Sequence, residues 1–302
     1  MYVNAAGLVL RETPYKDSSK ILTVLTSGEG KLTVSARGAL RRNSKLTAVT
    51  QLLAFSEMTL YRSRDRWTLT EARSVEQFIG LREDIALLAL GAYFAELTEA
   101  VADEDSPSPE LLPLILNALF ALSERIKAPA YVKPAFELRL MAASGFAPLI
   151  GRCAACGAGD LERAVLDFSG GTVRCARCGP AEPPAAAHQS IAGCAPSTPT
   201  AARRSGTVDG PNSPVGAAAP HASAPAGSCS LGRGALAAAR YIIGCDAKKL
   251  FSFELGDAAL RELSSATEGY LLAQLDRGFR TLDYYYAVCP LSFNDPEPSQ
   301  RG

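Results

Sequence analysis

Two Cys-x2-Cys pairs separated by eighteen residues constrain the fold of this chain more than any other feature; they are Cys153, Cys156, Cys175 and Cys178. Four thiolates at this spacing can surround one zinc ion tetrahedrally. Between the pairs, two β-type runs at residues 164–168 and 172–174 flank Ser169-Gly170-Gly171, which is typical of a hairpin. The pattern predicts a zinc ribbon, with disulfides or a vestigial site as the alternatives.

The predicted zinc site has a structural rather than a catalytic character. Four sulfur ligands close the coordination shell, whereas a catalytic zinc keeps one open position. Both histidines, His188 and His221, lie beyond the cysteines in a Pro/Ala-rich stretch. No base is therefore evident beside a metal-bound water, and we expect the zinc to hold a small insert together.

The composition is that of a cytosolic protein with more than one domain. The 302 residues are 47% hydrophobic and carry a formal net charge of zero. The first residues lack the pattern of a signal peptide, and the longest apolar stretch, residues 85–97, is too short for a membrane span. In a reducing compartment, eight cysteines indicate metal binding and buried thiols. Cys194 and Cys229 lie in a segment expected to be disordered, while Cys245 and Cys289 are expected to be bystanders.

The first eighty residues have a β-strand pattern. A hairpin turn at Ser27-Gly28-Glu29-Gly30 separates two runs rich in branched residues. Five strands are expected, at residues 5–10, 20–26, 31–36, 52–61 and 67–71. Five short strands of this kind favour a small Greek-key barrel of the OB type, although periodicity alone does not separate it from other small barrels.

Helical periodicity begins near Val75 and continues on both sides of the cysteine insert. The first helix is expected to end near residues 103–105, and Ser108 with Pro109 is expected to start the next. A third helix is predicted from about residue 132 to 143, helices resume after Leu231, and the last long one covers residues 257–275. The predicted fold is therefore α+β, an OB-type barrel followed by a helical domain with an inserted four-cysteine ribbon.

Residues 181–230 differ in kind, since Ala, Pro, Ser, Gly and Thr occupy 37 of these 50 positions. Such a segment cannot bury enough apolar surface to offset its ordering entropy, so we interpret it as a flexible insertion. Arg203 and Arg204 within it are weak evidence for nucleic-acid contact. The predicted parts are residues 1–80 (barrel), 81–150 (helices), 151–180 (ribbon), 181–230 (insertion), 231–290 (helices) and 291–302 (disordered tail).

A basic segment follows the third predicted strand and contains Arg37, Arg41, Arg42 and Lys45 without an acidic residue. Further arginines lie around the fourth and fifth strands, at Arg62, Arg64, Arg66 and Arg73. Positive charge concentrated on one small barrel of a neutral protein suggests that a polyanion docks there. Tyr61 and Trp67 could offer stacking faces to unpaired bases. The competing interpretation is a solvated basic loop with Trp67 in the core.

The chain resembles the RecO family of bacterial DNA repair proteins in an ordered set of segments. These are residues 7–11, 17–26, 36–39 with Arg41-Arg42, 249–253 and 270–285. The resemblance covers nearly all of the chain outside residues 181–230, and that insertion departs from the family pattern. It implies an OB domain, a helical domain and a four-cysteine zinc site. It also implies a bacterial, nucleoid-associated recombination mediator of the RecF pathway, which binds single- and double-stranded DNA.

The same resemblance implies partners and a mechanism. Such proteins anneal complementary strands, work with RecR, and displace single-stranded DNA-binding protein so that RecA can load. The helical region would offer a groove to the C-terminal tail of single-stranded DNA-binding protein. The residues expected to neutralise phosphates are Arg37, Arg41, Arg42 and Lys45, with Lys20, Arg62, Arg64 and Arg66 as outer contacts.

Three rival functions compete with this interpretation. Gly28-Glu29-Gly30-Lys31 lacks the leading glycine of a phosphate-binding loop and has Leu32 where Ser or Thr is required. A metallonuclease would use acids in a Pro/Ser-rich connection, where a solvated loop is the simpler account; they are Asp103, Glu104, Asp105 and Glu110. We therefore expect no enzyme. The stronger alternative is a non-enzymatic RNA-binding protein of translation or transcription.

Overall fold

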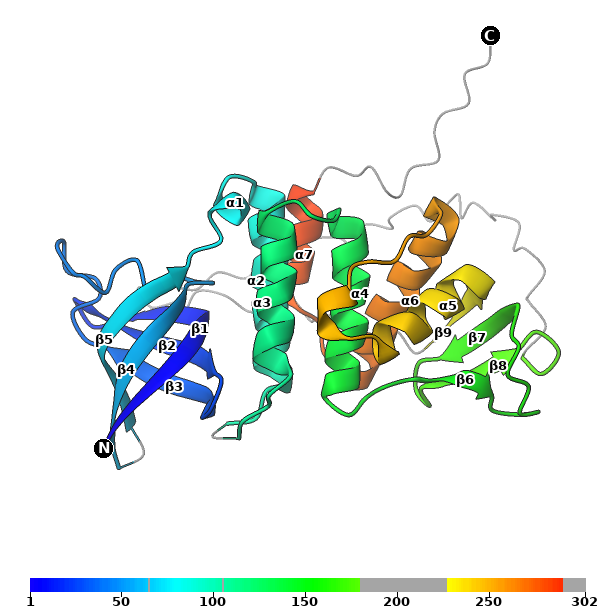
Figure 1. Cartoon of the computed structure of the whole chain (residues 1–302), viewed down its shortest axis with the longest axis horizontal. Helices are drawn as coiled ribbons and strands as arrows, with labels where there is room; N and C mark the ends of the chain where they lie inside the picture. Colours follow the sequence, from blue (N-terminus) through cyan, green and yellow to red (C-terminus); the bar gives the residue numbers. More distant parts are fainter. Residues whose placement is uncertain (65, 105, 180–226, 290–302) are drawn as a thin grey trace, which may run out of the picture.

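The computed structural model describes residues 1–64, 66–104, 106–179 and 227–289. Its three parts lie in a row, with a β-barrel at one end, helices in the middle and a small β-sheet at the other end (Figure 1). The predictions for Cys194, Arg203, Arg204 and both histidines concern residues outside these ranges.

Five strands close the N-terminal barrel: β1 (Tyr2–Tyr15), β2 (Ser19–Thr26), β3 (Gly30–Ala36), β4 (Phe55–Ser63) and β5 (Arg66–Glu76). Their order around the barrel is β1-β2-β3-β5-β4. All pairings are antiparallel except that of β3 with β5, which are parallel at Val34–Trp67 and Ser35–Thr68. This closed arrangement confirms the predicted five-stranded barrel of OB type.

Alternating side chains fill the barrel, as the period of a β-strand requires. The inward set consists of Val9, Leu22, Val24, Leu32, Val34, Ala36, Ala39, Met58, Leu60, Trp67 and Leu69. The strands run further than the sequence pattern indicated. β5 continues to Glu76, which lies opposite Phe55 on β4, so the helical region does not begin at Val75 but at Ile79.

The connection from β3 to β4, residues 37–54, is a series of tight turns without a helix. The amide of Arg41 donates to the carbonyl of Gly38, and that of Ser44 donates to the carbonyl of Arg41. A further bond, from the Leu40 amide to the Ser18 carbonyl at 3.0 Å, ties the connection to the β1–β2 turn. The basic segment is therefore held at a defined end of the barrel.

Among the described residues, seven α-helices form the middle of the molecule: α1 (Ile79–Arg82), α2 (Ile85–Val101), α3 (Leu111–Ser123), α4 (Pro129–Ala143), α5 (Arg233–Gly244), α6 (Asp257–Leu275) and α7 (Arg280–Val288). The limits of α6 match the prediction. α2 ends before the predicted acidic run, at Val101. α3 begins at Leu111 after Glu110, so the prediction of Ser108 as its cap was wrong.

A buried polar network joins three of these helices, α2, α4 and α6. Glu137 on α4 is fully buried, and its carboxylate accepts from the hydroxyls of Tyr93 on α2 and Thr267 on α6, both at 2.9 Å. Lys133, also on α4, lies 2.7 Å from Glu137 and 2.5 Å from Glu268 on α6. Buried polar groups that are all paired in this way fix the relative positions of helices.

The ribbon sheet contains β6 (Leu149–Cys153), β7 (Arg163–Asp167), β8 (Thr172–Cys175) and β9 (Ser228–Gly232) in the order β6-β8-β7-β9. The hairpin of β7 and β8 was predicted, but β9 was not. Its residues 228–230 were assigned to the flexible insertion, and Cys229 with them; this boundary is wrong, because β9 pairs with β7 from Ser228 to Gly232.

Close packing and side-chain hydrogen bonds join the ribbon sheet to the helices. A side chain at Gly269 on α6 would collide with the Phe168 ring, since its Cβ would lie only 2.5 Å from that ring. Gln274 donates to the Phe168 carbonyl at 2.6 Å, and Arg240 on α5 donates to the Ile150 carbonyl at 3.0 Å. The sheet is thus part of the helical core rather than a separate module.

The barrel contacts the helices through β1, β2 and β3. Leu8, Leu10 and Leu25 belong to the same buried cluster as the helical core. Arg11 pairs with Glu99 on α2 at 2.7 Å, and the Lys31 ammonium donates to the Glu99 carbonyl at 2.9 Å. Among the described residues, none of the helices is long and apolar enough to cross a membrane.

Candidate metal centre and nucleic-acid interface

The four predicted cysteines converge at one point of the ribbon. Cys153 ends β6 and Cys175 ends β8, while Cys156 and Cys178 follow in the two turns. Their Sγ atoms all lie within 4.8 Å of one another. The backbone needs a positive φ of 74° behind the first pair, which Gly157 supplies.

The surroundings of the cluster favour thiolate at its centre. The Cys175 amide donates to the Cys153 Sγ at 3.3 Å. Amide donors, with that of Cys175 contributing most, lower the pKa of the Cys153 thiol to about 6. Hydrogen bonds that link the Cys178 thiol to the sulfurs of Cys156 and Cys175 act in the opposite direction and raise the pKa of Cys178 to about 12. A cation at the centre would oppose this rise, because it favours the charged form of every nearby thiol.

The spacing of the sulfurs fits a tetrahedral ion. Metal–sulfur bonds of about 2.3 Å, as in zinc sites, imply sulfur atoms about 3.8 Å apart. The Sγ atoms of Cys156 and Cys175 lie 3.8 Å apart. This cluster is the only group of metal-binding residue types that converges within the described ranges. The four cysteines can therefore hold a metal ion with a closed shell.

The basic segment is exposed at the β3–β4 connection. Arg37, Arg41, Arg42 and Lys45 are all exposed, and none forms an ion pair with a carboxylate of the described residues. Unpaired guanidinium groups on a tightly turned backbone can meet phosphates without first losing an internal partner.

Lys20 does not share this exposure. Its side chain lies on the inward side of β2, only 7% of the residue is exposed, and its ammonium group pairs with Glu12 and donates to the Thr50 carbonyl at 3.4 Å. The prediction that Lys20 is an outer DNA contact is therefore withdrawn. The alternation Lys20, Leu22, Val24 along β2 was a signal for this inward position.

The second group of arginines surrounds the β4–β5 turn. Arg62, Arg64 and Arg66 are exposed, and the Arg62 guanidinium lies 5.1 Å from the centre of the Trp67 ring. Trp67 itself is only 5% exposed and belongs to the barrel core, so it offers no stacking face. Tyr61, in contrast, is 38% exposed.

The structure also bears on the rival sites. Residues 27–29 form the β2–β3 turn, in which the Glu29 amide donates to the Thr26 hydroxyl at 3.0 Å. Since Lys31 is engaged by Glu99, this turn has no free lysine for a phosphate. Asp103 and Glu104 are exposed in the α2–α3 connection and, together with Glu110, belong to no convergent cluster of described residues.

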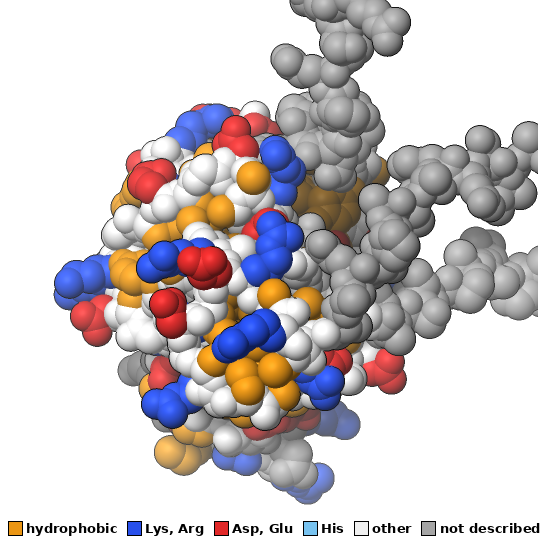
Figure 2. Space-filling view, turned by 90° about the vertical axis from the view of Figure 1, so that its right-hand side faces the viewer, with side chains coloured by type: hydrophobic (Ala, Val, Ile, Leu, Met, Phe, Trp, Pro, Cys, Tyr) orange, Lys and Arg blue, Asp and Glu red, His pale blue; other side chains and the backbone are white. Residues whose placement is uncertain are grey.

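Charge is distributed differently at the end opposite the barrel. Figure 2 shows that basic, acidic and hydrophobic side chains are interspersed on that face. Among the residues that the structure describes, the barrel thus carries the longest basic segment without an acidic residue, at the β3–β4 connection.

Comparisons with known proteins agree with the architecture. The family described as "Recombination protein O N terminal" matches residues 1–78, and "Recombination protein O C terminal" matches residues 82–195. A relative named DNA repair protein RecO from Caldicellulosiruptor bescii is 33% identical over 58% of this chain and 72% of its own length. The chain belongs to the RecO family. A RecO protein from Acetivibrio thermocellus is 26% identical over 94% of this chain and 96% of its own length.

Membership of the RecO family gives the chain a role in DNA repair and recombination. Another relative of this name, from Desulforudis audaxviator, is 35% identical over 59% of this chain and 71% of its own length. The resemblance found in the sequence is thereby confirmed, and the OB-type barrel, the helical region and the cysteine cluster are present in the described structure.

Proposed function

We propose that this protein is a recombination mediator that binds DNA through its barrel and anneals complementary single strands. It would act with RecR, and it would help RecA to load onto DNA coated by single-stranded DNA-binding protein, whose C-terminal tail would dock in the helical region. One observation carries the proposal: a chain of the RecO family presents Arg37, Arg41, Arg42 and Lys45 exposed and free of described carboxylate partners.

The annealing mechanism follows from electrostatics. Two DNA strands repel each other through their phosphates, and a surface that neutralises both removes this barrier while base pairing supplies the specificity. The contacts would be Arg37, Arg41, Arg42 and Lys45, joined by Arg62, Arg64 and Arg66. Each phosphate contact releases counterions, so the affinity should fall with salt by a log–log slope of about 0.7 per contact on single strands.

In this proposal the four cysteines hold zinc, and its role is structural. Zinc would supply a closed tetrahedral link between the two turns of the ribbon and no reaction. Residues 1–80 would be the DNA-binding domain, with residues 81–150 and 231–290 as the two parts of the helical domain around the ribbon insert. The protein would act in the bacterial cytoplasm at the nucleoid, without an enzymatic activity of its own.

The test is annealing of labelled complementary DNA strands coated with single-stranded DNA-binding protein. The native chain is compared with a variant in which Arg37, Arg41, Arg42 and Lys45 are replaced by Ala. A matched control removes four exposed cations elsewhere: Arg233, Lys248, Lys249 and Arg261. Trp67 fluorescence verifies that the barrel remains folded, because Trp67 is the only tryptophan and lies in the barrel core.

We expect rapid annealing by the native chain and the control, and loss of annealing in the barrel variant. The salt slope of single-strand binding should fall by about 3 in the barrel variant if all four residues contact phosphates. Equal losses in both variants would show that net charge alone matters. Absence of annealing by the native chain, with RNA binding retained, would favour the RNA-binding alternative.

A further inference from the structure

An outward-facing row of side chains crosses four strands of the barrel. Tyr2 on β1 lies opposite Tyr61 on β4, Tyr61 lies opposite Thr68 on β5, and Thr68 lies opposite Ser35 on β3. We call these four residues the tyrosine row. With strands about 4.8 Å apart, the row is about 14 Å long.

Both tyrosines of the row are exposed to solvent although they contact each other. Tyr2 is 67% exposed and Tyr61 is 38% exposed. Their ring centroids lie 4.9 Å apart with an angle of 49° between the ring planes. The rings support each other across the β1–β4 pair, and they leave apolar faces in contact with water. Such a pair can stack unpaired bases, because every base has a π-face.

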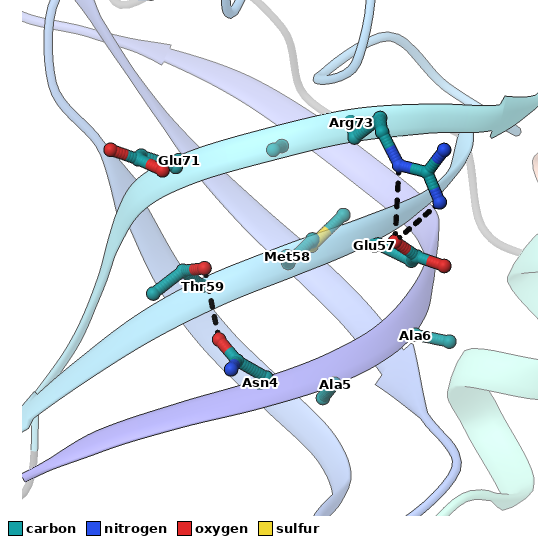
Figure 3. Close-up of a pocket in the computed structure, with 9 residues that line it drawn as sticks. Asn4, Ala5, Ala6, Glu57, Met58, Thr59, Glu71 and Arg73 are labelled. Carbon is teal, nitrogen blue, oxygen red and sulfur yellow. Dashed lines mark hydrogen bonds and ion pairs between the residues drawn. The ribbon is translucent and has the colours of Figure 1, made fainter.

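Charge on either side of the tyrosine row differs in sign. At the β4–β5 turn, Arg66 lies two residues before Thr68, and Arg64 lies in the turn itself. On the other side lies a groove of about 530 Å³ on the outer face of β1, β4 and β5. Figure 3 shows Glu57 and Glu71 along this groove, where Glu57 pairs with Arg73 at 2.8 Å.

This distribution of charge favours binding of phosphates on the β4–β5 turn side of the tyrosine row rather than on the groove side. Glu71 lines the groove and forms no ion pair with a described residue, so phosphates are repelled from that side. The arginines of the turn attract them on the other. A strand whose phosphates follow Arg64 and Arg66 places its bases over Tyr2 and Tyr61. Sheets that recognise RNA stack two or three bases on surface aromatics across a similar width.

We infer that the tyrosine row is a stacking platform that gives this barrel a preference for unpaired bases over duplex. The inference rests on the proposed DNA-binding function and names the form of DNA that this site takes. A duplex presents phosphates to the arginines but keeps its bases inside, so only a single strand gains from the tyrosines.

The experiment measures binding of the full chain to a thymidine oligonucleotide and to a duplex of equal length at one salt concentration. The variants are Tyr2→Ala with Tyr61→Ala, and Tyr2→Phe with Tyr61→Phe. Tyr284→Ala removes an exposed tyrosine of α7 as a matched control, and Glu71→Ala changes the same barrel face on the groove side. Any purification tag is placed at the C-terminus, because the Met1 amino group contacts the Arg62 carbonyl at 3.1 Å.

The alanine pair should weaken single-strand binding by about 5-fold to 160-fold, the range for loss of one stacked base, with duplex binding unchanged within about twofold. The phenylalanine pair should retain binding, since the ring face and not the hydroxyl is used. A fluorescent base analogue should be quenched on binding to the native chain and to the phenylalanine pair only. Tyr284→Ala and Glu71→Ala should not weaken binding.

Three outcomes separate this inference from the proposed function. If the native chain binds and anneals DNA but the alanine pair binds single strands as tightly, the stacking platform is refuted and the proposed function stands. If single-strand and duplex binding fall equally in the alanine pair while Trp67 fluorescence is native, the tyrosines act only through the phosphate surface and the platform is again refuted. If the native chain binds no DNA, the proposed function itself fails.

Discussion

Replacement of Lys133 by Met should destabilise the helical domain strongly. Among the described residues, Lys133 is the only cation that forms an ion pair with the fully buried Glu137. Without it, the carboxylate keeps only the hydroxyl donors of Tyr93 and Thr267. Removing one partner of a buried ion pair costs about 3–5 kcal/mol, because the other charge is left uncompensated. The second pair of Lys133, with the partly exposed Glu268, adds at most about 1 kcal/mol.

A second substitution tests the cause of this loss. Glu137→Gln, added to Lys133→Met, removes the orphaned charge and keeps an oxygen that can accept from Tyr93 or Thr267. The double variant should therefore be more stable than Lys133→Met alone by at least about 2 kcal/mol, although two residues have changed. Stability changes of two substitutions that deviate from additivity by this amount, and in this direction, are expected only when the two side chains belong to one buried network.

The loss should also depend on pH. Burial, its largest cause, raises the pKa of Glu137 above the usual value for a glutamate, and removal of Lys133 raises it further. A folded carboxyl with a raised pKa binds more protons than the unfolded one, so its penalty grows as pH rises above the unfolded pKa of about 4.3. The destabilisation of Lys133→Met relative to the native chain should thus be larger at about pH 8 than at about pH 5.

Urea unfolding separates the two parts of the molecule. Far-ultraviolet circular dichroism follows the helices, whereas fluorescence of Trp67 follows the barrel. Lys133→Met should shift the circular dichroism transition to a lower urea concentration. The urea concentration at which Trp67 fluorescence begins to change should stay the same. A loss below about 1 kcal/mol, or a double variant as unstable as the sum of the single ones, would refute the view that this network is a tightly coupled buried ion pair.

Two further outcomes are expected. Gly30→Ala should lower the free energy of unfolding by at least about 1–2 kcal/mol, because φ is +73° and the new Cβ would lie 2.3 Å from the Ser106 carbonyl oxygen. Gly28→Ala in the same turn is the control, since its Cβ meets no atom within 4 Å, and thermal unfolding compares the two variants. Chelation under reducing conditions should increase amide exchange in β7 and β8 without changing Trp67 fluorescence, and unchanged exchange would mean that the four cysteines hold no metal.

The alternation of side chains between the two faces of a strand explains which parts of the candidate site could be predicted from the sequence. The barrel was predictable, because its inward positions alternate and a glycine-containing turn fixes the β2–β3 hairpin. The same alternation places Lys20 with Leu22 on the inward side and separates Tyr61 from Leu60. Composition alone had grouped Lys20 with the surface arginines. Tyr2 was missed because only the β1–β4 register brings it beside Tyr61.

Strand β9 was hidden for a different reason. The segment Ser228–Gly232 contains one buried apolar residue, Leu231, and follows a long run of small residues. Its backbone is ordered by pairing with β7, and the Gly232 amide also donates to Glu262 on α6 at 2.8 Å. Long-range partners of this kind leave no local pattern, so a strand supported mainly by them escapes periodicity.

The position of β9 gives the metal site a consequence for the helices. The chain leaves the helical core after α4 and returns to it through β9, which leads directly into α5. Strand β9 pairs with β7, and the other neighbour of β7 is β8, which ends in Cys175. Loss of the metal should therefore loosen the entry to α5 before it affects the barrel at the other end of the molecule (Figure 1). Since the proposed DNA contacts all lie on the barrel, replacing the four cysteines by Ser should lower stability while DNA affinity stays within about twofold. A matching fall in affinity would place part of the DNA interface on the helical side.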